Sequence, residues 1–303
     1  MAIITPALLL AMNTALQKAF KDAYKAMQAE SVYTRIATTV PSSTTSNTYA
    51  WLGDFPQLRE WVGDRVLKDM KAQGYQISNK LYEATLGVPR VAIEDDQYGH
   101  YATIAASMGQ EAAQHPDRMI AAVMAAGTAA LCYDGQNFFD TDHPVYPNVD
   151  GTGTAATVSN FTTGANPAWY LLDTRKVLKP FIFQERTKPE MEHKTNPATS
   201  DNVFTKDRFE HGIRYRCNAG YGFWQMAFRS QLTLNAANFV AARDAMGAFK
   251  ADGGRPLGIN PNVLVVPKSL RAAADAVINA QLISGGESNV LYKTVDVIVS
   301  DWL

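Results

Sequence analysis

The sequence predicts an α+β fold that begins with a helical arm and ends in a compact unit of alternating helices and strands. Three observations support this prediction. Apolar residues recur every four positions near the N-terminus, as in an amphipathic helix: Leu8, Met12, Leu16, Phe20 and Tyr24. Residues 98–130 are rich in alanine and methionine, which favours a long helix. Residues 235–300 are predicted to form helix, strand, helix and strand, the order of an α/β layer.

The first helix has a clear start signal at Thr5-Pro6. Threonine can accept a hydrogen bond from a free N–H group of the first turn, and proline is tolerated at the first helical position. The four-residue spacing continues this helix to about residue 29. The polar, uncharged residues 38–48 (TTVPSSTTSNT) predict an extended linker, so we expect the helix to be a flexibly tethered arm.

Residues 51–94 predict a projecting hairpin. It would contain a short helix at 58–70 and strands at about 75–82 and 86–93. Its charges alternate in sign, a pattern typical of a solvated face but also suited to docking on a neighbour through complementary pairs. These charged residues are Asp54, Arg59, Glu60, Asp64, Arg65, Lys68, Asp69 and Lys71.

The long central helix is interrupted in sequence only by His115-Pro116, where we expect a kink or a restart because proline lacks a backbone donor. Glu94, Asp95 and Asp96 are expected to cap its N-terminus, where the helix dipole stabilises negative charge. The Gly-, Thr- and Asn-rich residues 148–166 predict a loop and an internal boundary.

The second half of the chain predicts a sheet of long antiparallel strands followed by the α/β unit. The strands are expected at 168–172, 180–184, 209–216 and 221–228. The α/β unit would comprise a helix at 235–251 opened by Asn235 or Asn238, a buried strand at 262–267, a helix at 269–280 and a strand at 295–300.

Composition excludes several classes of function. Lys plus Arg number 28 and Asp plus Glu 29, so the chain has no overall attraction to nucleic acid or acidic membranes. Two cysteines are too few for a disulfide framework, which favours a reducing compartment. We expect no membrane span and no export signal.

Enzyme-like motifs are weak. The glycine-rich segment 151–156 lacks the strand and helix that flank a dinucleotide-binding loop and predicts a flexible loop. Segment 253–258 lacks the Lys-Ser/Thr pair of a phosphate loop and predicts the turn that ends the preceding helix. The strongest cluster is Asp140, Asp142 and His143, whose side chains could hold a metal ion or transfer protons, although short polar residues before Pro144 also suit an ordinary turn. A metal-assisted hydrolase is therefore the alternative to a structural protein, and we assign no catalytic, metal or cofactor residue.

Several segments together resemble the Mu-like prophage major head subunits, in the family's order along nearly the whole chain. These are residues 38–45 (TTVPSSTT), 49–65 (YAWLGDFPQLREWVGDR), 83–85 (EAT), 93–101 (IEDDQYGHY), 132–144 (CYDGQNFFDTDHP), 218–225 (NAGYGFWQ), 242–250 (ARDAMGAFK), 254–258 (GRPLG) and 262–267 (NVLVVP). The resemblance implies a structural protein of a phage head and not an enzyme, with a minor decoration or tail protein as a further alternative.

This resemblance implies the Hong Kong 97-type phage capsid fold, which is an α+β fold. Its parts are expected at 1–47 (N-terminal arm), 48–95 (extended loop), 96–230 (peripheral domain) and 231–303 (axial α/β domain). Within the peripheral domain we expect a long spine helix at about 97–130 and a long-stranded sheet at about 168–230. The strand-rich segment lies nearer the C-terminus in many relatives of this fold.

The resemblance also implies partners. The chain is expected to assemble with itself, as hexamers and pentamers, into an icosahedral head around double-stranded DNA that it contacts weakly and without sequence preference. A separate scaffolding protein, a portal protein at one vertex and a decoration protein are further expected partners, with assembly in the host bacterial cytoplasm. On the extended loop we expect contacts between subunits from Trp51, Asp54, Arg59, Glu60, Trp61 and Arg65.

Overall fold

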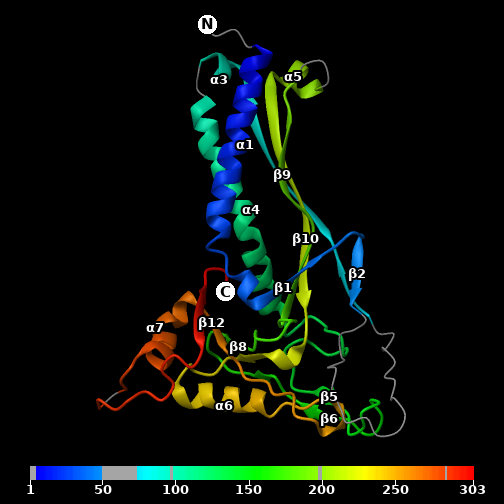
Figure 1. Cartoon of the computed structure of the whole chain (residues 1–303), viewed down its shortest axis with the longest axis vertical. Helices are drawn as coiled ribbons and strands as arrows, with labels where there is room; N and C mark the ends of the chain where they lie inside the picture. The colour runs from blue at the N-terminus through cyan, green and yellow to red at the C-terminus, as the bar shows by residue number, and fades with distance from the viewer. Residues whose placement is uncertain (1–4, 50–73, 96–97, 197–199, 284) are drawn as a thin grey trace.

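The computed structural model describes residues 5–49, 74–95, 98–196, 200–283 and 285–303. The molecule is elongated (Figure 1). Its upper part consists of two long helices beside a narrow, long-stranded sheet, and its lower part of a second sheet with shorter helices against it. Within the described residues, no helix is long and apolar enough to cross a membrane.

Helix α1 (Pro6–Gln28) is the predicted amphipathic helix. The Thr5 hydroxyl accepts a hydrogen bond from the Leu8 N–H at 3.2 Å, and Pro6 begins the helix, as the sequence predicts. Met12, Leu16 and Phe20 are buried against the second long helix, α4 (Tyr98–Ala126), and the upper sheet. The apolar stripe therefore packs within the subunit, and the expectation of a flexibly tethered arm is wrong.

Helix α4 confirms the predicted central helix but does not restart at Pro116. The proline lies inside the continuous helix. The strand predicted at 86–93 ends at Pro89, and the prediction is wrong beyond it because residues 90–94 form helix α3 (Arg90–Glu94). Glu94 pairs with Arg90 and Asp95 closes α3, so these two acids do not open α4, while Asp96 is outside the described residues.

The upper sheet has the strand order β1-β9-β10-β4. Its strands are β1 (Ala37–Pro41), β4 (Lys80–Pro89), β9 (Phe181–Lys194) and β10 (Arg208–Tyr221), with α5 (Asp201–Lys206) between the last two. Buried side chains alternate along β10, including Phe209, Ile213 and Tyr215, as expected for a sheet with one face against helices. β9 and β10 run far beyond the predicted segments 180–184 and 209–216.

The predicted linker at 38–48 is instead largely strand. β1 pairs in parallel with β9, and β2 (Ser46–Tyr49) pairs antiparallel with β3 (Tyr75–Ser78). The short helix α2 (Tyr33–Ile36) connects α1 to β1. Polar, β-branched residues are compatible with either an extended linker or an edge strand. The strand that pairs with β1, and so decides between the two, is more than a hundred residues away in the sequence.

The lower sheet has the order β13-β12-β8-β11-β7. Its strands are β7 (Phe161–Thr162), β8 (Trp169–Leu172), β11 (Ala227–Ser230), β12 (Val263–Pro267) and β13 (Asp296–Ser300). The single sheet predicted over 168–230 is therefore wrong: β8 and β11 join the C-terminal strands, whereas β9 and β10 belong to the upper sheet. The predicted boundary at 148–166 supplies β7 and also β6 (Ala156–Val158), which pairs with β5 (His143–Val145).

The C-terminal helices lie against this sheet, and the predicted order of helix, strand, helix, strand is confirmed. Helix α6 (Ala236–Gly247) opens with the Asn235 side chain accepting from the Asn238 N–H. The second helical stretch combines a 3-10 turn (Lys268–Leu270), α7 (Arg271–Ala274) and a π-helical turn (Asp275–Asn279). Further 3-10 turns lie at Trp224–Met226 and Asp252–Gly254.

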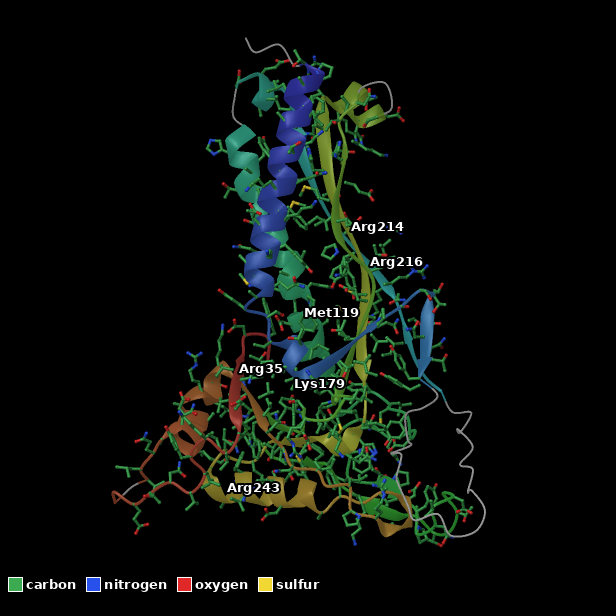
Figure 2. All side chains as sticks on the ribbon, in the orientation of Figure 1. Arg35, Met119, Lys179, Arg214, Arg216 and Arg243 are labelled. Carbon is green, nitrogen blue, oxygen red and sulfur yellow. The ribbon has the colours of Figure 1, made fainter. Side chains whose placement is uncertain are left out.

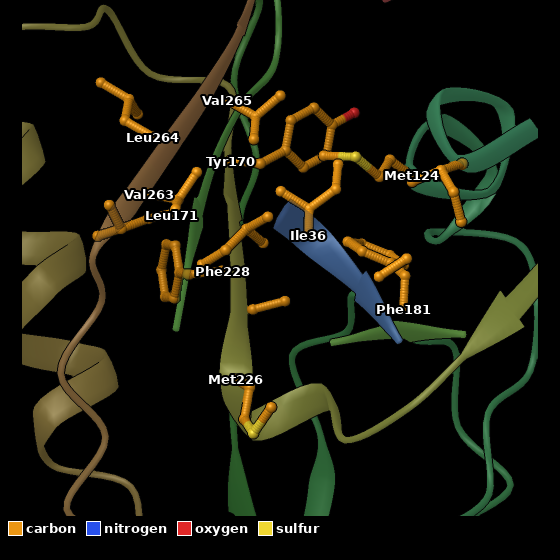
Figure 3. Packing of buried hydrophobic residues seen from close by; sticks show 14 of the residues in the cluster. Ile36, Met124, Tyr170, Leu171, Phe181, Met226, Phe228, Val263, Leu264 and Val265 are labelled. Atoms are coloured by element: carbon orange, nitrogen blue, oxygen red, sulfur yellow. The ribbon is translucent and has the colours of Figure 1, made fainter. Parts of the chain in front are cut away.

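The core of the lower part gathers side chains from distant segments (Figure 3). Ile36 follows the arm, Met124 comes from α4, and Phe181 begins β9, and all three pack with residues of β8 and β12. The largest fully buried side chains include Trp169, Trp224, Phe138 and Phe139. The arm and the spine helix thus contribute to the same core as the C-terminal unit.

Gly109 sets the distance between α1 and α4. A Cβ atom built on Gly109 would lie 2.3 Å from the backbone oxygen of Phe20, whereas one on Gly99, in the same helix, would meet nothing within 4 Å. Replacing Gly109 by alanine is therefore expected to lower the free energy of unfolding by about 1–3 kcal/mol, because backbone must shift. Gly99→Ala, the matched control, is expected to leave it unchanged or slightly higher. Chemical denaturation measures both, and equal stability of the two variants would contradict this account.

Candidate assembly surfaces and a buried polar turn

The root of the extended loop is held by hydrogen bonds to the upper sheet. The Tyr49 hydroxyl donates to the Gln184 side-chain oxygen at 2.8 Å, and the Gln184 amide donates to the Ile77 carbonyl and the Asn79 side chain. Gln184 is fully buried in β9. The proposed contact residues Trp51, Asp54, Arg59, Glu60, Trp61 and Arg65 all fall outside the described residues. The structure therefore places the base of this loop but not those side chains.

Asp117 anchors the arm to the spine helix. Its carboxylate accepts hydrogen bonds from the Ser31 hydroxyl at 2.6 Å, the Val32 N–H at 3.1 Å and the Tyr33 N–H at 2.6 Å. Burial raises the pKa of Asp117, and these three bonds oppose that shift by stabilising the charged form. The residue follows Pro116 directly, and the sequence analysis missed it because its partners are more than eighty positions away.

The outer face of the upper sheet carries charged side chains in alternation with the buried ones. Arg214 and Arg216 lie on this face of β10 (Figure 2). The strand register sets Arg214 between Glu83 of β4 and Glu190 of β9. Such cross-strand neighbours of opposite charge favour the observed register. This mixed-charge face lies on the outside of the subunit, so it is a candidate surface for contact with another molecule, as the extended loop is.

A third feature is a buried polar turn after α4. His143 is fully buried, and its Nδ1 lies 2.7 Å from an oxygen of Asp134, while the Cys132 thiol donates to the other Asp134 oxygen at 3.0 Å. The Gln136 N–H donates to Asp134 as well. Burial raises the pKa of the Cys132 thiol, so the sulfur stays protonated and acts as a donor.

The other side of His143 is equally constrained. Its Nε2 lies 3.3 Å from the Asn160 side-chain oxygen, and its ring stacks on Trp224 at 4.0 Å between centroids. The Asn160 amide nitrogen donates to the backbone oxygens of Phe138, Trp224 and Ala227, which fixes the orientation of the amide. Both ring nitrogens of His143 therefore face side-chain oxygens, and the ring is held between Asp134 and Asn160.

This arrangement bears on the metal-assisted hydrolase. Cys132, Asp134 and His143 form a group with metal-binding side chains among the described residues, and their ligand atoms lie within 4.8 Å of one another. Ligands of a tetrahedral zinc ion are about 3.3–3.8 Å apart, given zinc–ligand distances of 2.0–2.3 Å. The 2.7 Å and 3.0 Å contacts are shorter and match hydrogen bonds.

The triad named from the sequence is not assembled. Asp140 accepts hydrogen bonds from the Asn137 N–H and amide and from the Thr141 N–H, and Asp142 is exposed. Only His143 of the three joins the buried group, and its partner is Asp134. These acids stabilise a turn, which is the alternative that the sequence analysis weighed against the metal site.

The comparisons with known proteins agree with this organisation. The model of the family described as Mu-like prophage major head subunit gpT matches residues 9–303. The chain belongs to this family. A curated relative, the major capsid protein of Escherichia phage Mu, is 44% identical over 307 residues, which cover 99% of this chain and all of the relative.

Solved structures extend the match to the fold. The subunit in the procapsid of bacteriophage JBD30 is 54% identical and superposes with a TM-score of 0.87, covering 99% of this chain and 100% of that one. The subunit in the JBD30 capsid decorated with minor capsid protein trimers is 41% identical, with a TM-score of 0.76 and complete coverage of both chains. The Mu-like head subunit therefore has the Hong Kong 97-type capsid fold.

The head subunit is thus a structural component of the virion that assembles into multimeric shells. The family and its relatives are capsid proteins and not enzymes, so the hydrolase alternative is not supported. The match to major capsid proteins over the whole chain also sets aside a minor decoration or tail protein. The hydrogen bonds of the polar turn and of the loop root therefore have a structural role: they fix the conformation of the backbone in a shell subunit.

Replacing Asp134 by asparagine is expected to lower the free energy of unfolding at neutral pH by about 1–3 kcal/mol, because buried His143 and Cys132 lose the charged carboxylate to which they are hydrogen-bonded. Asp142→Asn, an exposed acid in the same segment, is the matched control and is expected to match the wild type.

The pH dependence follows from the pKa of Asp134. Burial raises this pKa, but hydrogen bonds and charge from His143 and the bond from Cys132 outweigh that effect and hold the pKa below its usual value. Asp134 therefore stabilises the fold above its unfolded pKa of about 3.9 and loses this contribution as the pH falls through the lower folded pKa. Thermal unfolding between pH 2 and 7 is expected to show a steeper acid loss for the wild type than for Asp134→Asn. Parallel losses of stability at acid pH would rule out this role of the Asp134 carboxylate.

Proposed function

We propose that this head subunit forms hexamers and pentamers that close into an icosahedral head around double-stranded DNA. The observation that carries the proposal is the full-length match to the JBD30 procapsid subunit, together with the elongated two-part shape of this chain. A subunit of this shape exposes separate surfaces to several neighbours. Contacts of modest area then become stable because each subunit makes many of them at once.

The extended loop is proposed to lie over an adjacent subunit and to contact it through Trp51, Asp54, Arg59, Glu60, Trp61 and Arg65. Support comes from the root of the loop, where buried Gln184 and the β2–β3 pair fix the direction in which the chain leaves the upper sheet. A fixed root lowers the entropy that a loop loses when it docks. Large aromatic side chains on such a loop are typical interface anchors.

The proposal includes further partners. The JBD30 relative carries minor capsid protein trimers, which favours a decoration protein here too. We also propose a separate scaffolding protein, a portal protein at one vertex, weak contact with packaged DNA and assembly in the host cytoplasm. The charge of −1 supports only loose contact with DNA.

The domain limits stay a proposal. The limits 1–47, 48–95, 96–230 and 231–303 follow the resemblance, but the sheet topology favours different ones. Strands β8 and β11 lie on one side of residue 230 and β12 and β13 on the other, yet all four belong to the lower sheet. We therefore propose that the axial part also includes the segments around β7, β8 and β11, with the upper sheet and α1 in the peripheral part.

Assembly is tested by electron microscopy of the purified chain, expressed with and without the neighbouring scaffold gene product. Closed particles of uniform size, or rings of five and six subunits, are the expected result. A small oligomer of constant size under both conditions would contradict the proposed function, because a shell subunit must make contacts that extend in two dimensions.

The loop contact is tested by Trp61→Ala. Loss of an interface anchor is expected to weaken the contact by about 2 kcal/mol or more and to lower the temperature at which assembled shells dissociate. Trp302→Ala is the control, since Trp302 packs under Arg118 of its own subunit at 5.1 Å. Trp61→Ala shells with unchanged yield and thermal stability, followed by light scattering, would show that the indole makes no contact between subunits.

A further inference from the structure

A hairpin projects from the lower part of the subunit between the π-helical turn and β13 (Figure 1). It comprises the described residues 281–283 and 285–290. The Ile283 N–H donates to the Glu287 oxygen at 2.9 Å, and the Asn289 N–H donates to the Gln281 oxygen at 2.9 Å. Gly285 and Gly286 have φ values of 97° and 81°, the left-handed conformation that suits glycine.

The base of this hairpin is fixed to the subunit. The Asn289 amide donates to the backbone oxygens of Val277 at 2.9 Å and Ala280 at 2.8 Å, and its side-chain oxygen accepts from the Leu291 N–H. Leu291 itself is buried in the lower core. Because these contacts hold both ends of the hairpin, it loses less conformational entropy on docking than a free loop of the same length.

The hairpin presents apolar side chains. The exposed fractions of Leu282, Ile283 and Val290 are 60%, 46% and 88%. Glu287 is the sole charged residue between positions 276 and 292. An ordered, projecting group of large apolar side chains is typical of a contact with another protein.

The shell itself identifies the partner as a second copy of this chain, so the inference rests on the proposed function. A contact between two identical hairpins would relate two subunits by a two-fold axis, whereas a ring of five or six needs a head-to-tail contact between different surfaces. The receiving surface must therefore lie elsewhere on the subunit, displaced sideways from the hairpin.

The end of the lower part that carries β5 and β6 meets this requirement. Figure 1 shows the β5–β6 pair on the opposite side of the lower part from the orange-red hairpin. The segment between these strands exposes 61% of Val149. It is braced by hydrogen bonds from the Gly253 N–H to the Tyr146 oxygen and from the Tyr146 N–H to Asp252, both at 2.9 Å.

We propose that the hairpin of each subunit, through its described residues 281–283 and 285–290, docks on the β5–β6 end of the next copy in the same ring, where it contacts Val149. Each contact is small, and five or six repeats around a closed ring make it stable. The preordered hairpin reduces the entropy lost on docking.

The first test is the double variant with Ile283→Asp and Val290→Asp. Val177→Asp is the matched control, because Val177 is 98% exposed on the connection between β8 and β9. Circular dichroism and thermal unfolding of unassembled subunits check that all three chains fold. We expect the control to assemble as the wild type does and the double variant to need at least a tenfold higher concentration for shells, measured by sedimentation and electron microscopy.

The outcomes separate the two proposals. Shells from the double variant at the wild-type concentration would overturn the hairpin contact and leave the proposed function intact. A wild-type chain that forms neither shells nor rings would instead overturn the proposed function.

The second test keeps the surface apolar and maps the receiving site. Assemblies are formed from a mixture of Val290→Cys and Val149→Cys subunits and oxidised with diamide, with each variant alone as control. The native Cys132 and Cys217 are both buried, which keeps background reaction low. A disulfide-linked dimer that appears only in the mixture is expected. Dimers from Val290→Cys alone, or no dimer in the mixture, would overturn the head-to-tail contact.

Discussion

The burial of one helix in two separate cores holds this subunit together. The first half of α4 packs through Ala105 and its neighbours into the upper cluster, with Met12, Leu16 and Phe20 of α1. Its second half packs through Ile120 and Met124 into the lower cluster, with Trp169 and the C-terminal strands. Pro116 and Asp117 lie between the two halves, and Asp117 binds the turn after α1. Because protein interiors are close-packed, a shift of α4 would disturb both cores at once.

This arrangement suits a shell subunit. The helices cover one face of the upper sheet, while its charged outer face and the apolar hairpin remain at the surface. The Asp134–His143 pair lies inside the protein beside Trp224, where the two side chains bond to each other and not to a ligand. Removing these two side chains from water costs free energy. Hydrogen bonds to each of their polar atoms, including the bonds with Asn160 and Cys132, offset that cost. The pair can therefore fix one conformation of the turn after α4.

Predictions from the sequence succeeded where neighbours along the chain decide the outcome. Thr5 and Asn235 cap their helices as expected, because a cap bonds to a residue three positions away. The candidate site was harder to predict from the sequence. Asp134, Asn160 and Trp224 surround His143 from three segments, so the cluster of Asp140, Asp142 and His143, close in sequence, was the wrong grouping. The six loop residues proposed from the resemblance stay a prediction.

The sequence by itself determined the two long helices, the order of helix, strand, helix and strand in the C-terminal unit, the apolar stripe of α1 and the resemblance to a head subunit, because periodicity, caps and motifs are local properties. Only the tertiary structure decided which strands share a sheet. β8 and β9 follow each other closely in the chain but belong to different sheets, and β1 pairs with β9 across more than a hundred residues. Strands pair through backbone hydrogen bonds, and almost every residue has the same backbone donor and acceptor, so these bonds do not specify which strands pair. The side chains that pack in the two cores around α4 select the partners instead.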